Sequence, residues 1–472
     1  MSQHSGKAVR AGIGYTIGNI LVRGINFLSL PLFSRLMTTE EFGAFNLFIS
    51  YEAVLSIVLC LALNTSTKSA NQEFPGQIDD YTSSVSLIFV LNAVFAGALA
   101  LLLGGPLSNL LGLSIPLLLL MVVHAFGSSL LMFYVSRIVL DYSYKKYLVI
   151  SFLESLGNIC FSLLLILTVF RSDKSLGRII GATVSLSAIT AFILHELYKT
   201  AKPRYDKSYW KFGIKYSLPL VPHGLSSALL GQVDKMMIGS MVGNSSLGIY
   251  SLAGNIKLIP LVLSDSISHA WGTWFFEMIA DGEKNEIQKR AGQLSVLFMV
   301  LTVGLMAISP ELILLLGGEK YSEGSAVAIP MIVDAFLLFL YGLVVQIEYY
   351  RKKTIYIMYG TLAATAIDLI LNYIFIRRYG YAAAAYTTLF SYIIFLILHL
   401  LIAYRLEHFH VISMKILLLT IAVIVASGAV SILLEHNWIL RYLCCLGTVL
   451  PAFMWLLKNA GDLRGMIFGK ND

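Results

Sequence analysis

Ionisable and amide side chains stand within the long apolar segments of this sequence, where they could bind a charged substrate. Arg23 lies near the middle of the first segment, and Asn19 and Asn26 share its helix face. Lys257 is a second cation, placed near the middle of a later segment. Because a guanidinium binds phosphate or carboxylate through two parallel hydrogen bonds, these four residues are predicted to contact an anionic, polar substrate.

Carboxylates inside apolar segments are candidates for coupling transport to a proton or a sodium ion. A charge at the bilayer centre costs at least about 2.5–3.5 kcal/mol, so it is expected to face water or a partner. Asp368 stands in a polar stripe with Thr361, Thr365 and Asn372. Structural ion pairs are the alternative, between Arg23 and Glu52 or between Lys257 and Asp234 or Asp334. The candidate coupling residues are Asp368, Glu52, Glu154 and Asp334.

Histidine, cysteine and tryptophan have simpler interpretations. His124 is expected to be an ordinary core histidine. The cysteines fall inside apolar segments without metal-ligand spacing, so we expect small buried hydrophobic residues, no metal site and no disulfide. Tryptophans near segment ends are expected to anchor the chain at the membrane interface. The cysteines are Cys60, Cys160, Cys444 and Cys445, and the tryptophans are Trp271, Trp274, Trp438 and Trp455.

The composition indicates a membrane protein that is helical throughout. Of 472 residues, 57% are hydrophobic and 13% are charged, which excludes an ordinary soluble domain. Apolar runs of about 20 residues predict about fourteen transmembrane helices. Prolines are expected to interrupt or bend some of these helices, at Pro31, Pro219, Pro222 and Pro260.

Repeated landmarks divide the chain into two halves of about 200 residues each. Glu41-Phe42-Gly43 follows the first apolar segment, and Ser246-Leu247-Gly248 follows the seventh. This order predicts two parallel six-helix repeats around a central cavity, as in transporters with alternating access. The expected parts are an N-lobe (1–200, helices 1–6), a cytoplasmic linker (201–216), a C-lobe (217–408, helices 7–12), and helices 13–14 with a cytoplasmic C-terminus (409–472).

The distribution of basic residues predicts the orientation in the membrane. About two-thirds of the Lys and Arg residues lie at the termini and in the loops on their side, so both termini are expected in the cytoplasm. The basic stretch from Lys199 to Lys215 is the strongest contribution. It favours a topogenic, lipid-facing role, and no nucleic-acid partner is expected. The net charge of +7 follows largely from these flanks.

Four stretches in chain order carry a family resemblance: Arg35 to Gly43, Leu218 to Ile238, Leu247 to Lys257, and Asp368 to Tyr381. Together they resemble the Wzx-like polysaccharide flippases of the multidrug/oligosaccharidyl-lipid/polysaccharide exporter superfamily. One departure is Ala382-Ala383-Ala384, where related chains more often carry a glycine, and it affects local packing.

The resemblance implies a multi-pass protein of the bacterial cytoplasmic (inner) membrane. Such a protein moves an undecaprenyl-pyrophosphate-linked oligosaccharide to the outer leaflet for O-antigen, capsule or exopolysaccharide synthesis. It implies no cofactor, a proton or sodium gradient as the energy source, and no covalent chemistry. The implied partners are the lipid-linked oligosaccharide, membrane lipids and the polysaccharide polymerase machinery.

Three other functions remain open at this point. An ion-coupled multidrug or cation antiporter of the same superfamily would use an anionic or aromatic cavity, and the intramembrane carboxylates are compatible with one. A lipid II flippase would also have a cationic cavity, with more arginines than this chain has. A membrane-embedded polymerase or glycosyltransferase would need a large external loop or a catalytic domain, and no catalytic motif stands out, so the sequence indicates a transporter and not an enzyme.

Overall fold

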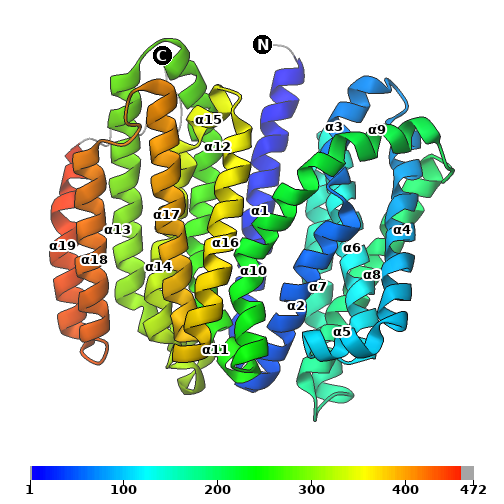
Figure 1. Ribbon diagram of the computed structural model, residues 1–472, viewed down its shortest axis with the longest axis horizontal. Coiled ribbons are helices and arrows are strands. Elements are labelled where there is room, and N and C mark those ends of the chain that lie inside the picture. The colour runs from blue at the N-terminus through cyan, green and yellow to red at the C-terminus, as the bar shows by residue number, and fades with distance from the viewer. Residues whose placement is uncertain (1–2, 459–472) are drawn as a thin grey trace. The chain divides into compact units, whose positions relative to one another are not determined.

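The computed structural model describes residues 3–458, and helices with short connections make up that whole range. The chain divides into two compact units, Met1–Gly248 and Ile249–Asp472 (Figure 1). Residues 1–2 of the predicted cytoplasmic N-terminus and residues 459–472 of the predicted cytoplasmic C-terminus lie outside the described residues.

Unit 1 is built around α6, which packs against α2, α4 and α8 (Figure 1). Helix α7 packs against α8 and also against α1, and α10 lies along α2. The helices are α1 (Gln3–Leu36), α2 (Thr39–Cys60), α3 (Leu63–Glu73), α4 (Ile78–Leu102), α5 (Gly104–Leu111), α6 (Ile115–Leu140), α7 (Tyr144–Thr168), α8 (Lys174–Thr200), α9 (Lys207–Ser217), the 3-10 turn η1 (Leu218–Leu220), α10 (Val221–Met241) and the start of α11 (Asn244–Gly254).

Unit 2 is built around α14, which packs against α12, α13 and α17. Helix α16 pairs with α17, while α18 and α19 pack on α13 at one edge of the unit (Figure 1). After α11 come η2 (Asn255–Lys257), α12 (Leu258–Ala280), α13 (Lys284–Gly317), η3 (Glu319–Tyr321), α14 (Gly324–Val344), α15 (Gln346–Tyr350), α16 (Thr354–Tyr379), α17 (Ala382–Glu407), α18 (Met414–Leu433) and α19 (Trp438–Lys458).

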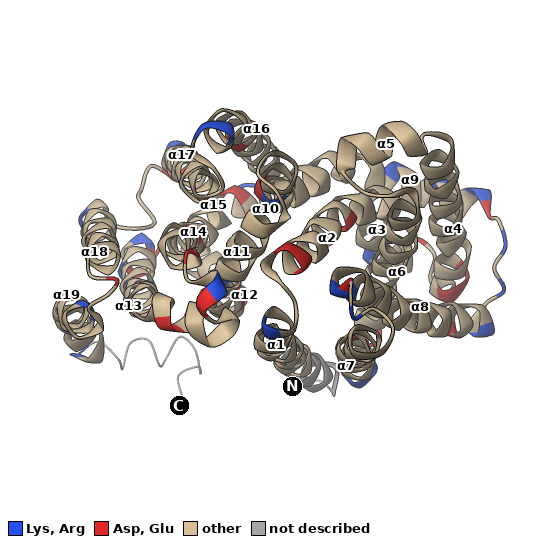
Figure 2. Cartoon of the chain, turned by 90° about the horizontal axis from the view of Figure 1, so that it is seen from below, with Lys and Arg blue, Asp and Glu red and all other residues tan. Residues whose placement is uncertain are grey.

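Thirteen helical segments between residues 3 and 458 are long and apolar enough to cross a membrane. The predicted seventh span corresponds to α10, which has 21 residues but carries His223, Asp234 and Lys235 and so is less apolar. Charged positions occupy few turns of the helices (Figure 2). The prediction of an all-α, multi-pass membrane protein with about fourteen spans is therefore confirmed.

Three of the four predicted prolines lie at two breaks in the helices. Pro219 lies in the 3-10 turn η1 that separates α9 from α10, and Pro222 lies in the first turn of α10, where its missing N–H costs nothing. Pro260 follows the 3-10 turn η2, which separates α11 from α12. In contrast, α1 continues through Pro31.

The repeated glycine landmarks meet inside unit 1. A Cβ atom on Gly43 would lie 1.7 Å from the carbonyl oxygen of Asn244, and one on Gly248 would lie 2.0 Å from that of Thr39. The Thr39 hydroxyl is also 2.8 Å from the Ser245 hydroxyl. Only glycine allows backbones to approach this closely, so both landmarks are explained by one backbone-to-backbone contact between α2 and the start of α11.

Two expectations from the sequence are wrong. Trp271 is fully buried, and its indole N–H donates to the carbonyl oxygen of Leu343, because α12 packs against α14 there. It therefore stabilises a helix contact and does not anchor an interface. Cys160 and Cys444 are exposed on the chain, whereas Cys60 and Cys445 are buried as expected.

Replacing Gly43 or Gly248 with alanine should destabilise unit 1. Overpacking of this kind costs about 1–3 kcal/mol, so we expect a lower thermal unfolding midpoint for the detergent-purified protein. Gly97→Ala is the matched control, because Gly97 is also helical and a Cβ there would meet no atom within 4 Å. An unfolding midpoint equal to that of the control would contradict the close contact.

Candidate functional site

The predicted substrate-binding residues of unit 1 lie on the exposed face of α1. Asn19, Arg23 and Asn26 are all exposed on the chain. The Tyr147 hydroxyl of α7 donates to the side-chain oxygen of Asn19, and Gly18 allows α7 to pack closely against α1. The sequence periodicity therefore predicted the shared face correctly, and α7 fixes the orientation of one end of it.

A cluster of titratable groups lies at the junction of α2, α6 and α7. Glu52 and His124 are both buried, and the distance between Glu52 Oε1 and His124 Nδ1 is 3.4 Å. Glu154, half-buried on α7, interacts electrostatically with the same histidine. We call Glu52, His124 and Glu154 the acidic–histidine cluster. It brings together two of the predicted coupling carboxylates.

His124 differs from the ordinary core histidine expected from the sequence. Its Nδ1 atom is buried and makes no hydrogen bond, although a carboxylate oxygen is only 3.4 Å away. The ring also meets Phe48 edge to face at 5.9 Å between centroids. The imidazole and the carboxylate therefore lie close enough to interact electrostatically without a hydrogen bond between these two atoms.

In unit 2, the predicted polar stripe of α16 faces α17. Asp368 is fully buried, and it accepts hydrogen bonds from the hydroxyls of Thr388 at 3.2 Å and Ser391 at 3.4 Å. One turn along, the Thr387 hydroxyl donates to the Asn372 side chain. Carboxylate, amide and hydroxyl oxygens are the ligands that hard cations prefer.

Lys257 and Asp334, the other two predicted site residues of unit 2, lie on different elements. Lys257 ends the 3-10 turn η2 and is half-buried, so the second cation lies where the helix breaks. Ser264 and Ser268, further along the same face of α12, are buried and half-buried. Asp334 is buried on α14. The functional roles of these residues remain predictions.

Sequence reasoning missed a buried pair in unit 2. Glu348 of α15 and His399 of α17 are both 0% exposed, and the distance between Glu348 Oε1 and His399 Nδ1 is 2.5 Å. Gly360 of α16 makes room for the ring, since a Cβ there would lie 2.4 Å from Nε2. The rule that ionisable residues within apolar segments are unusual would have identified both members.

A buried arginine in unit 1 was also missed. Arg178, near the start of α8, lies between two aromatic rings, with its guanidinium carbon 3.3 Å from the centroid of Phe33 and 4.3 Å from that of Phe45. These cation–π contacts join α8 to α1 and α2. The position of Arg178 at the edge of an apolar segment left it without a distinguishing signal in the sequence.

The ionisable side chains described above could bind and release a ligand, but they are not arranged as a metal centre. Between residues 3 and 458, no group of three or more His, Cys, Asp or Glu side chains is arranged to hold a metal ion. The amide and guanidinium face of α1 suits an anionic polar ligand, and the buried carboxylates suit small cations.

Comparison with known proteins finds relatives named for glycan and polysaccharide biosynthesis. The probable low-salt glycan biosynthesis flippase Agl15 of Haloferax volcanii is 23% identical over 83% of this chain and 82% of its own length. The capsular polysaccharide biosynthesis protein CapF of Staphylococcus aureus is 22% identical over 81% of this chain and 95% of its own length.

The fold is shared with a solved structure. The lipid II flippase MurJ in its inward closed conformation has a TM-score of 0.75 and 17% identity, over 95% of this chain and 99% of MurJ. A family model described as "polysaccharide biosynthesis protein" matches residues 8–278, which is more than half of the chain. The chain therefore belongs to this family of polysaccharide biosynthesis proteins.

Proposed function

We propose that this protein is a flippase that moves an undecaprenyl-pyrophosphate-linked oligosaccharide from the cytoplasmic to the outer leaflet. The observation that carries the proposal is the exposed face of α1, where Arg23 is flanked by Asn19 and Asn26 inside a membrane-spanning helix. Family membership and relatives named as glycan flippase and capsular polysaccharide protein support it.

The substrate chemistry matches these side chains. Arg23 would bind the pyrophosphate through two hydrogen bonds, and Lys257 would supply a second positive charge. Asn19 and Asn26 would bind sugar hydroxyls, while the lipid tail remains in the bilayer. In this proposal, the N-lobe (1–200) and the C-lobe (217–408) surround the site and open alternately to each side, which requires no covalent step.

The cellular setting follows from the same proposal. The protein would lie in a bacterial cytoplasmic membrane with both termini in the cytoplasm and would deliver repeat units to a polysaccharide polymerase. An ion-coupled antiporter is the second candidate, because Glu52, Asp334 and Asp368 are buried inside spans. Export of a small cation, with no movement of lipid-linked sugar, would establish it.

We also propose that a proton gradient drives the cycle through the acidic–histidine cluster. Glu52 and His124 come from different helices, so protonation changes the attraction between α2 and α6. A second coupling route would run through Asp368, because its carboxylate and the neighbouring hydroxyl oxygens of Thr388 and Ser391 suit a sodium ion.

Arg23→Ala should abolish translocation of a fluorescent polyprenyl-pyrophosphate oligosaccharide in proteoliposomes, because the pyrophosphate loses its bidentate partner. Arg23→Lys should retain part of the activity, since it keeps the charge and loses the fork geometry. Arg204→Ala, in the exposed connection between α8 and α9, is the control and should transport normally. Full activity of the alanine variant would remove Arg23 from the substrate path.

Glu52→Gln should abolish the dependence of transport on an imposed proton gradient, because the amide cannot take up the proton. Asp368→Asn should leave that dependence intact and remove any dependence on a sodium gradient. Both variants are compared with wild type in the same proteoliposomes. The reverse pattern would place the proton site at Asp368 and contradict the role of the cluster.

A further inference from the structure

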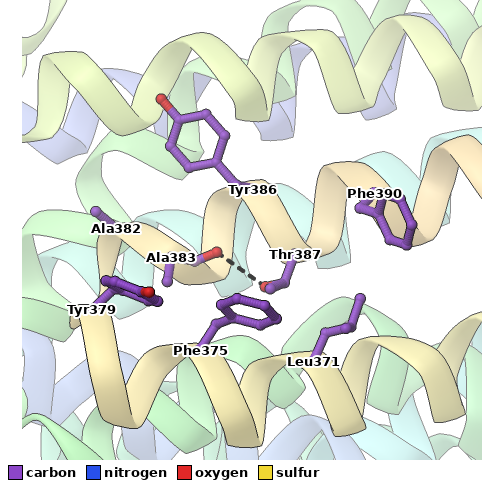
Figure 3. A pocket seen from close by; sticks show the side chains of 8 residues that line it. All are labelled: Leu371, Phe375, Tyr379, Ala382, Ala383, Tyr386, Thr387 and Phe390. Carbon is purple, nitrogen blue, oxygen red and sulfur yellow. Dashed lines mark hydrogen bonds between the residues drawn. The ribbon is translucent and has the colours of Figure 1, made fainter.

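An apolar groove runs along the α16–α17 pair of unit 2 (Figure 3). Its volume is about 570 Å³, within the range of small-molecule sites. Four aromatic rings dominate the lining, from Phe375 and Tyr379 on α16 and from Tyr386 and Phe390 on α17. Each of these side chains is more than a third exposed, so the groove is open along the helix pair.

The groove offers little to a polar ligand. Besides the two tyrosine hydroxyls, its polar side chain is Thr387. The Thr387 hydroxyl already lies within hydrogen-bond distance of the Ala383 carbonyl oxygen (Figure 3), and also of the Asn372 side chain and the Ala384 carbonyl oxygen. No charged residue is among the lining residues. The groove therefore fits an apolar chain and not a sugar or a phosphate.

Two arginines stand beside Tyr379, outside the groove lining, at the end of α16. Arg377 and Arg378 precede Tyr379 at the C-terminal end of α16, and both are exposed. The guanidinium carbon of Arg378 lies 5.7 Å from the centroid of the Tyr379 ring. An amphiphile with an apolar tail and an anionic head would complement this arrangement.

We propose that the α16–α17 groove binds the isoprenoid chain of a polyprenyl diphosphate, with the diphosphate against Arg377 and Arg378. This inference rests on the proposed function, and it adds a lipid-binding site on the side to which the substrate is delivered. With both termini in the cytoplasm, α16 runs outward, so the arginines lie at the outer surface.

The charge of the headgroup distinguishes this occupant from ordinary membrane lipid. A diphosphate carries more negative charge than a phospholipid phosphate, and two neighbouring guanidiniums match it. The aromatic lining also suits a chain with a methyl branch and a double bond in each unit, since rings give a large apolar contact area. A product lipid held there would be kept at the outer leaflet after its headgroup has crossed.

Photocrosslinking tests the site. Wild-type protein in nanodiscs is irradiated with a polyprenyl diphosphate that carries a diazirine on its isoprenoid chain, and the labelled peptides are mapped by mass spectrometry. We expect adducts within residues 371–390. Ala383→Trp should fill the groove and lower the yield by about tenfold or more, whereas Ala96→Trp, at a half-buried alanine of α4, should leave it unchanged.

The two arginines are tested separately. The double variant Arg377→Gln/Arg378→Gln should weaken labelling by the diphosphate by about tenfold, with labelling by a diazirine polyprenol unchanged. Equal labelling by a diazirine phospholipid, or competition by excess phospholipid, would show ordinary lipid contact and overturn the proposal. If Ala383→Trp transports normally and wild type gives no adducts in the groove, the groove proposal fails while the flippase function stands.

Discussion

The cost of placing charge in a bilayer constrains how ionisable side chains lie within the apolar helices of this protein. Buried ionisable groups lie beside groups of opposite or complementary character. Glu52 meets His124, Glu348 meets His399, and Asp368 accepts two hydroxyl hydrogen bonds. Arg178 is held by the faces of two aromatic rings. In contrast, Arg23 is exposed on the chain, although it stands in a membrane-spanning helix. Exposure thus distinguishes Arg23 from the buried groups, which lie at contacts between helices.

Close helix contacts make this arrangement possible, and they depend on small residues. The glycines of the two repeat landmarks bring the backbones of α2 and α11 into contact. Gly360 gives the His399 ring its space between α16 and α17, and Gly18 lets α7 approach α1 beside Asn19. Without a hydrophobic driving force between helices in lipid, such close packing and buried polar contacts supply much of the association energy.

The spacing of residues in the sequence predicted features that lie within one helix. It did not predict contacts between two helices. The shared face of Asn19, Arg23 and Asn26 and the buried stripe around Asp368 follow from a 3.6-residue period, so both could be predicted. The break before Pro260 follows from the chemistry of proline. The partners of His124 and His399, and the burial of Trp271 against α14, depend on which helices are neighbours. Spacing along one chain does not contain that information, so those contacts required the structure.

The positions of the charges also bear on the energetics of transport. A pyrophosphate that crosses a membrane would carry its negative charge through the low-dielectric region, and Arg23 and Lys257 would neutralise part of it. One coupled ion gains only about 2.3 kcal/mol per 100 mV, which is less than the cost of one uncompensated charge at the bilayer centre. In the proposed cycle, the energy gained from one coupled ion would therefore be too small to move an unshielded headgroup across the membrane. The role of the gradient would be to reset the conformation of the protein. Arg23 and Lys257 would lower the free energy of moving the pyrophosphate across the membrane.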